Sequence, residues 1–146
     1  MAFVTAALGE GTEVTLEARQ FTWRSDEPVG AGGTDLGPTP YEILLGSLAA
    51  CIAITLRLYS NHKGIALPEV VVRLDFDRVH ADDCRDCDDR ADGWIDRITS
   101  QVTIRGTFDD AQRRRLTQVA QRCPVHKTLA NGVHLVDSVV FDPPSA

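Results

Sequence analysis

Hydrophobic and polar residues alternate in short runs over the first 25 residues of the chain. From Val14 to Ala18 every second residue is apolar, which is the pattern of a half-buried strand. A similar run from Val4 to Leu8 precedes it, and Gly9-Glu10-Gly11 between the two predicts a hairpin turn. A third short strand is expected from Phe21 to Arg24. The stretch from Ser25 to Pro40 is rich in Gly, Pro and Asp, which predicts a long loop.

The strongest helix signal in the sequence runs from Pro40 to about His62. Thr39 is placed to cap the helix, Pro40 occupies its first position and Glu42 follows three residues after the cap, which together form a capping box with a proline start. Gly64 ends the helix. Its apolar residues lie on every face, so it must be buried on all sides, either at the centre of the protein or between subunits. These residues are Ile43, Leu44, Leu45, Leu48, Ala49, Ala50, Ile52, Ala53, Ile54 and Leu56.

The second half of the chain predicts a strand pair, more helix and a last strand. Apolar residues alternate with polar ones from Val70 to Asp77, and Trp94 to Ile104 forms a second long strand. A helix is expected from Asp109 to about Arg122, a further helical turn from Val125 to Ala130, and a final strand from Val133 to Phe141. This order, without regular βαβ alternation, predicts a single α+β domain over residues 1–146 with antiparallel sheet.

Composition places the chain among folded proteins. It has 146 residues, of which 43% are hydrophobic and 25% charged, which allows a real core and excludes bulk disorder. The longest uncharged stretch, Ile43 to Leu56, is shorter than the roughly 20 residues that cross a bilayer. The first residues lack the basic start and apolar run of a signal peptide. We therefore expect a soluble cytoplasmic protein without a membrane partner.

The negative charge of the chain is concentrated in one stretch. Nine Asp and three Arg between Asp75 and Asp96 account for the whole formal net charge of −6. The remainder is balanced and carries no basic stripe, which argues against nucleic acid as a partner.

Two of the four cysteines, Cys51 and Cys123, occupy apolar surroundings far apart in the sequence. Each is interpreted either as a small buried core residue or as a reactive thiol. Apolar burial disfavours the thiolate, so a reactive Cys51 needs a cation from elsewhere in the fold. Cys123 precedes Pro124, which bends the chain and allows the thiol to approach another element. The sequence spacing alone does not choose between these interpretations.

The other two cysteines form a Cys84-x-x-Cys87 motif in the acidic loop, with His80 nearby. This motif allows three interpretations: a metal site, a dithiol, or two exposed cysteines without a function. His80, Cys84 and Cys87 supply three of the four ligands that structural zinc requires, and completion by Cys123 and His126 would span a strand and a helix. We therefore expect no metal cofactor, a mobile loop from His80 to Asp92, and freely titrating thiols.

Glu42 has two interpretations as well. Its position in the capping box explains it structurally. Nine residues separate it from Cys51, which is about half a turn net and roughly 13 Å along the helix axis. If the two share a site, a second subunit must supply one of them.

The stretch from Gly37 to Cys51, with its Pro40 start and Ala49-Ala50-Cys51, and the later Cys123-Pro124-Val125-His126 resemble the OsmC/Ohr family of osmotically induced and organic hydroperoxide resistance proteins. Asp26-Glu27-Pro28 and Gly32-Gly33 are similar to its OsmC-like branch. The resemblance extends over nearly the whole chain. It implies an intertwined homodimer with antiparallel sheets around central buried helices, and a thiol peroxidase that uses a peroxide substrate, an external dithiol reductant and no cofactor.

The resemblance also implies roles for individual residues. Cys51 matches the peroxidatic cysteine and Cys123 the resolving one. Glu42, or its neighbour Tyr41, matches the acidic residue that orients a catalytic arginine. The family carries this arginine in an early glycine-rich hairpin.

Three features depart from the family pattern. Residues 8–11 contain no arginine, so Arg19 and Arg24 are the nearby candidates. His126 stands where peroxidase members usually carry a smaller polar residue, and the acidic loop with its two cysteines lies outside the pattern. The missing hairpin arginine motivates an alternative hypothesis, a non-catalytic dimer that binds a small apolar ligand.

Overall fold

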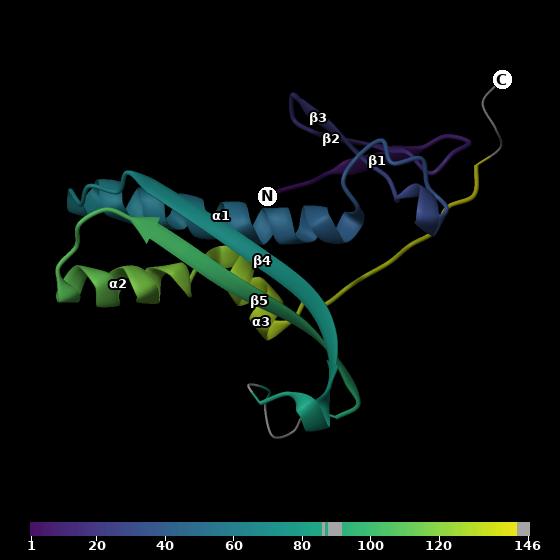
Figure 1. Cartoon of the computed structure of the whole chain (residues 1–146). Coiled ribbons are helices and arrows are strands. Elements are labelled where there is room, and N and C mark those ends of the chain that lie inside the picture. Colours follow the sequence, from purple (N-terminus) through teal and green to yellow (C-terminus); the bar gives the residue numbers. More distant parts are fainter. Residues whose placement is uncertain (86, 88–91, 143–146) are drawn as a thin grey trace.

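In the described part of the chain, the fold consists of two separate antiparallel sheets and three α-helices (Figure 1). The computed structural model describes residues 1–85, 87 and 92–142. A three-stranded sheet is formed by the N-terminal residues, and a long two-stranded ribbon comes from the middle of the chain. Strands and helices do not alternate regularly along the sequence. This order confirms the α+β class that the sequence predicts.

The N-terminal sheet contains β1 (Thr5–Leu8), β2 (Val14–Ala18) and β3 (Phe21–Ser25), in that order. Leu8 pairs with Val14 across the first hairpin, and Ala18 pairs with Phe21 across the second. The two-residue turn of the second hairpin places Arg19 at φ 54°, in the left-handed region that favours tight turns. The strands predicted from the alternating pattern are thus confirmed.

Helix α1 spans Pro40–Lys63 and is the longest of the described helices (Figure 1). The predicted capping box is present: the Glu42 amide donates to Thr39 Oγ1 (3.2 Å), and the Thr39 amide donates to Glu42 Oε2 (2.7 Å). Gly64 ends the helix at φ 67°, where a side chain would be strained.

The ribbon consists of β4 (Glu69–His80) and β5 (Trp94–Arg105), which pair antiparallel along their whole length. Opposite charges face each other across the two strands, because residues directly opposite in the register lie close enough to pair. The pairs are Arg78 with Asp96, Arg97 with Asp77, and Arg105 with Glu69. The short 3₁₀ helix η2 (Ala81–Asp83) follows β4 at the tip of the ribbon.

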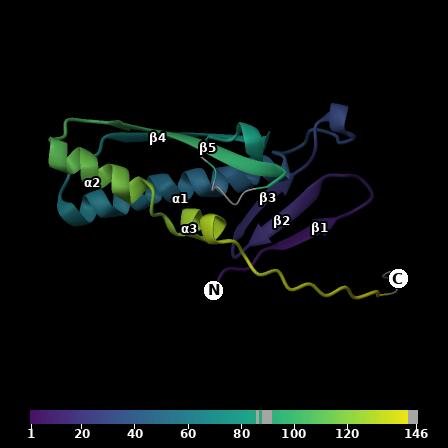
Figure 2. The same cartoon turned by 90° about the horizontal axis from the view of Figure 1, so that it is seen from below.

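All three helices pack against one face of the ribbon (Figures 1 and 2). Helix α2 spans Asp110–Ala120 and begins with a second capping box, between Asp109 and Gln112. Helix α3 spans Pro124–Asn131. The buried apolar core comes from α1, α2 and the segments beside them, and alternate residues of β4 and β5 pack onto it. Its members are Leu48, Ile52, Leu56, Leu67, Leu116, Val119 and Cys123.

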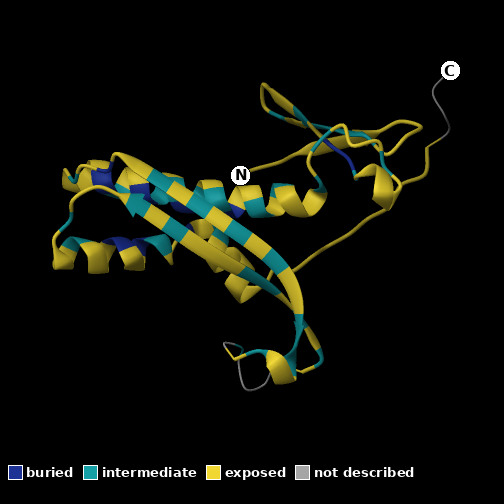
Figure 3. Cartoon of the chain, in the orientation of Figure 1, coloured by how far each residue is buried: buried dark blue, intermediate teal, exposed yellow. Residues whose placement is uncertain are grey.

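Within one chain, α1 is buried on one face only (Figure 3). Ile54 and Leu58 on another face are 57% and 63% exposed. By length and composition alone this helix could cross a membrane. Its buried face packs against β4, α2 and α3 instead, as a core helix does. The expectation of burial on every side is therefore not met by a single chain.

The expected last strand, Val133 to Phe141, is absent as a strand. This segment leaves α3 as an extended tail that pairs with no strand among the described residues (Figures 1 and 2). Its apolar side chains are solvent-exposed; Val136 is 83% and Phe141 93% exposed. The alternation that predicts a strand is real, but a strand also needs a paired neighbour, and this segment pairs with neither described sheet.

Candidate active site

Helices α1 and α3 bring the two free cysteines together. Cys51 lies at the middle of α1, and Cys123 lies immediately before α3. The two side chains are neighbours, because the Cys51 thiol contributes to the pKa shift of Cys123 and Cys51 packs against the core cluster that contains Cys123. Cys51 is half-buried, whereas Cys123 is fully buried in the core. The sequence separates these residues by more than 70 positions, and the bend at Pro124 allows them to meet.

Cys123 is the N-cap residue of α3. Its backbone is extended (φ −66°, ψ 151°), and its Sγ accepts a hydrogen bond from the His126 amide at 3.3 Å. Burial raises the pKa of the Cys123 thiol, and the hydrogen bond from His126 opposes this shift. The proximity of Cys51 raises the pKa further. Cys123 therefore stays protonated more readily than an ordinary exposed thiol, while Cys51 is the more accessible of the two.

A pocket of about 250 Å³ lies between α1, β5 and α3, and both apolar side chains and the polar Asp96, Ser100 and His126 line it. Leu48 and Ile52, which flank Cys51 on α1, form one wall, and Leu129 and Ala130 of α3 form another. His126 contributes to the lining, which places this residue next to the cysteine pair. The pocket has the character of a site for the apolar part of a small organic molecule.

Glu42 lies in the first turn of α1, nine positions before Cys51. Its carboxylate is occupied by the Thr39 amide, and the residue is exposed. The adjacent Tyr41 stacks on Phe76 of β4, with ring centroids 4.6 Å apart. The helix therefore holds both residues about two and a half turns from Cys51 of the same chain.

The two candidate arginines both belong to the N-terminal sheet. Arg24 on β3 forms an ion pair with Glu13 at 3.1 Å. Arg19 lies in the β2–β3 turn with its guanidinium 4.9 Å from the centre of the Phe21 ring. This sheet lies at the end of the molecule where α1 begins (Figure 1). Both side chains thus have partners within their own sheet.

One residue that positions α1 was not assigned a role from the sequence. Asp26 is 2% exposed, and its carboxylate accepts hydrogen bonds from the Thr12 hydroxyl, the Thr34 hydroxyl and the amides of Glu27, Thr34 and Leu36. These bonds lower the pKa of Asp26 far below its usual range, the bond from Thr34 most of all. Asp26 thus ties the first hairpin to the loop that leads into α1.

Close packing in the same loop explains one of its glycines. A Cβ at Gly33 would lie 2.0 Å from the carbonyl oxygen of Glu27, which no side chain can occupy. The sequence contains Asp26-Glu27-Pro28 and Gly32-Gly33 in this loop. This pattern does not indicate which groups donate hydrogen bonds to Asp26.

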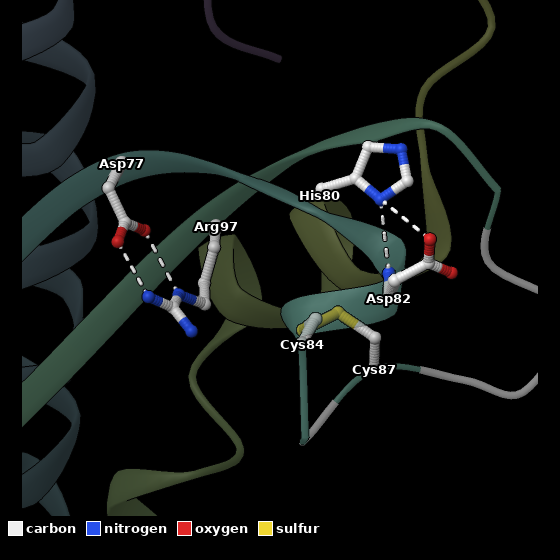
Figure 4. The surroundings of a disulfide bond; sticks show 6 residues. All are labelled: Asp77, His80, Asp82, Cys84, Cys87 and Arg97. Carbon is white, nitrogen blue, oxygen red and sulfur yellow. Dashed lines mark hydrogen bonds and ion pairs between the residues drawn. A yellow bond between two sulfur atoms is a disulfide. The ribbon is translucent and has the colours of Figure 1, made fainter.

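The expectation that Cys84 and Cys87 are free thiols is wrong. Cys84 and Cys87 form a disulfide, with Cα atoms 5.5 Å apart, so they are not the freely titrating thiols expected from the sequence (Figure 4). Within residues 1–85, 87 and 92–142, no cluster of three His, Cys, Asp or Glu side chains is arranged to hold a metal ion. The expected mobility of the loop falls partly on residues 86 and 88–91, which lie outside the described residues.

The family of the chain follows from comparison with known proteins. The family model for OsmC-like proteins matches residues 32–136, which include all four cysteines. The chain belongs to the OsmC-like family. Among curated protein sequences, none matches it.

Solved structures of OsmC-like and organic hydroperoxide resistance proteins share this fold. An OsmC-like protein from Mycoplasma pneumoniae is 25% identical, with a TM-score of 0.69 over 89% of this chain and 87% of that one. An organic hydroperoxide resistance protein from Legionella pneumophila is 17% identical, with a TM-score of 0.60 over 87% of each chain. The organic hydroperoxide resistance protein OhrB of Bacillus subtilis is 20% identical, with a TM-score of 0.55 over 87% of this chain and 88% of that chain. The resemblance seen in the sequence is thus confirmed at the level of family and fold.

Proposed function

We propose that this OsmC-like protein is a thiol peroxidase that reduces organic hydroperoxides with Cys51 and Cys123. The proximity of the two thiols carries the proposal, because two cysteines form a disulfide only when their sulfur atoms can reach each other. Their unequal burial assigns the order of reaction. The half-buried Cys51 is open to a peroxide, whereas the buried Cys123 reacts with its neighbour.

The reaction proceeds in three balanced steps. The Cys51 thiolate attacks the terminal oxygen of the hydroperoxide, the O–O bond breaks, and the alkoxide takes up a proton and leaves as an alcohol, with Cys51 as a sulfenic acid. Cys123 attacks the Cys51 sulfur, which forms a disulfide and releases water. An external dithiol then reduces this disulfide by two exchange steps and becomes oxidised itself.

The pocket next to Cys51 supports an organic rather than an inorganic peroxide. Its walls carry the apolar side chains of Leu48, Ile52 and Leu129, which favour an alkyl or aryl group. Hydrogen peroxide has no such group, and it would gain nothing from these walls. The order of preference we propose is therefore a bulky organic hydroperoxide over hydrogen peroxide.

The proposal includes a homodimer. Two apolar surfaces of the chain are exposed to solvent, which is unfavourable. They are the face of α1 with Ile54 and Leu58, and the tail from Val133 to Phe141. A second copy of the chain would cover both surfaces. In the dimer, Glu42 and an arginine of the N-terminal sheet, Arg19 or Arg24, would come to Cys51 from the other chain. A guanidinium beside Cys51 would favour its thiolate. We further propose that the protein acts in the cytoplasm.

A second candidate function rests on the same pocket. A dimer that binds a small apolar ligand without chemistry would use the walls of the pocket and leave both cysteines as core residues. The pairings of Arg19 with Phe21 and of Arg24 with Glu13 favour this alternative. The proximity of Cys51 and Cys123 favours the peroxidase.

Steady-state reduction of cumene hydroperoxide with a dithiol reductant tests the proposal. We expect Cys51→Ser to abolish turnover, because no other group supplies the attacking thiolate. Cys84→Ser/Cys87→Ser is the matched control and should retain wild-type turnover. Wild-type rates in the Cys51→Ser variant would refute the peroxidase and leave the binding function.

A further inference from the structure

The second pair of cysteines lies at the tip of the β4–β5 ribbon, beside η2 (Figure 4). Cys84 follows η2, and its amide donates to the Ala81 carbonyl at 3.2 Å. Cys84 and Cys87, joined by the disulfide, are both half-buried, and Arg85 between them is exposed. A thiol in solution can therefore approach this bridge.

The bridge contributes little to holding the fold together. It joins residues only three positions apart, and a disulfide constrains the unfolded chain least when its loop is short. The ribbon is already closed without it, because His80 pairs with Trp94 and the Ala81 amide donates to the Gly93 carbonyl at 2.8 Å. No residue of the buried core comes from the described part of the tip. The bridge can therefore open while the framework stays in place.

The chain is rich in acidic residues on either side of the bridge. Asp82 and Asp83 immediately precede Cys84, and both are exposed. From position 82 to position 92 the sequence holds six Asp against two Arg. His80 faces the same cluster, since its Nδ1 lies 3.3 Å from Asp82 Oδ2 (Figure 4). Such a potential repels an incoming anionic thiol and attracts a cationic one.

We propose that Cys84–Cys87 is a redox-active disulfide that exchanges electrons with thiols carried on positively charged molecules. A short bridge that adds little stability and remains open to solvent is of the labile, exchanging kind. The site works independently of Cys51 and Cys123, so it does not rest on the proposed peroxidase. Its natural partner is a dithiol set in a basic surface.

The exchange is a two-electron step. A thiolate of the external dithiol attacks one sulfur of the bridge, the S–S bond breaks, and the sulfur that leaves takes up a proton. The second thiolate of the partner then attacks the mixed disulfide and releases the other cysteine, which is also protonated. The chain gains two thiols, and the partner leaves as a disulfide.

A Cys51→Ser/Cys123→Ser variant isolates this site for the test. It is incubated at low ionic strength with cysteamine, which is cationic, or with 3-mercaptopropionate, which is anionic, at equal thiolate concentration. Alkylation and mass spectrometry then follow the opening of the bridge. We expect cysteamine to react about tenfold faster, and the ratio to fall toward one at about 1 M salt. An Asp82→Asn/Asp83→Asn variant should reduce the ratio at low salt.

Three outcomes would overturn the proposal. Equal rates with both thiols at low ionic strength would show that the acidic residues select no partner. A bridge that opens only when the protein is unfolded would be structural. Free Cys84 and Cys87 thiols in air-exposed native protein would show that the disulfide does not form. None of these outcomes bears on Cys51, so this proposal and the peroxidase fail separately.

Discussion

The thiols of Cys51 and Cys123 lie next to each other at the α1–α3 junction, the first half-buried and the second enclosed by the core. This relationship depends on Pro124, which begins α3 and makes Cys123 its N-cap, three residues after α2 ends. The same position makes Cys123 a helix cap and a neighbour of the reactive helix.

The raised pKa of Cys123 leads to a prediction about pH. Disulfide formation requires the Cys123 thiolate to attack oxidised Cys51, and burial favours the protonated thiol. An ordinary cysteine thiol has a pKa of about 8.5. We expect the rate of disulfide formation to keep rising at pH values where such a thiol is already ionised. Stopped-flow measurement of the second phase after mixing with peroxide, from pH 6 to pH 10, checks it. A rate that levels off near neutral pH would contradict the prediction.

Glu42 can be tested by two substitutions that separate its roles. Glu42→Gln keeps a side chain that can accept from the Thr39 amide, so thermal stability should stay near wild type. It removes the charge, so kcat/KM should fall at least tenfold if Glu42 orients an arginine at the site of the other chain. Glu42→Ala also breaks the capping box and should cost about 0.5–1 kcal/mol of stability. Full activity in Glu42→Gln would leave this residue with capping alone.

The lowered pKa of Asp26 predicts that the folded protein loses stability at acid pH. Its pKa is lowered in the folded state by the bonds from Thr34 and Thr12, so its contribution to stability is present at neutral pH and is lost as pH falls below about 4, the unfolded value. Asp26→Asn should lower the melting temperature at pH 7 and flatten its fall toward acid pH. Asp35→Asn, an exposed residue in the same loop, is the matched control and should behave as wild type. Identical pH profiles for Asp26→Asn and wild type would argue against the network.

Much of the fold could be predicted because local signals determine it. The capping box at Thr39 and Glu42, the alternation along β4 and β5, and the turn before Val14 each indicate their element directly. The tail after Asn131 could not be predicted correctly, because its alternation indicates a strand but not which chain supplies the neighbouring edge.

The arrangement of the candidate site could not be predicted from the sequence alone. A free cysteine in an apolar helix looks the same whether it is core or catalyst, and only the folded arrangement brings Cys123 to Cys51. The Asp26 network joins positions 12, 26, 34 and 36, which no short-range pattern connects. Likewise, the Cys84–Cys87 spacing suits both a metal site and a disulfide, and only the folded structure shows the two sulfur atoms bonded.

The exposed face of α1 and the apolar tail predict a dimer. We expect light scattering at micromolar concentration to give twice the chain mass of 16.0 kDa. Leu58→Asp should reduce this to one chain mass, because it places a charge on a face that would be covered. Val29→Asp, at an equally exposed position in the 3₁₀ turn η1 (Val29–Ala31), is the control and should remain dimeric. A wild-type mass of one chain would contradict the dimer.

The most direct test of the peroxidase follows the sulfur atoms themselves. The fully reduced protein is treated with one equivalent of cumene hydroperoxide, the remaining thiols are alkylated, and the disulfides are mapped by mass spectrometry. The account predicts a Cys51–Cys123 disulfide within the native protein, and a Cys51 sulfenic acid that persists in the Cys123→Ser variant. Unoxidised Cys51 after this treatment, with the peroxide intact, would contradict it.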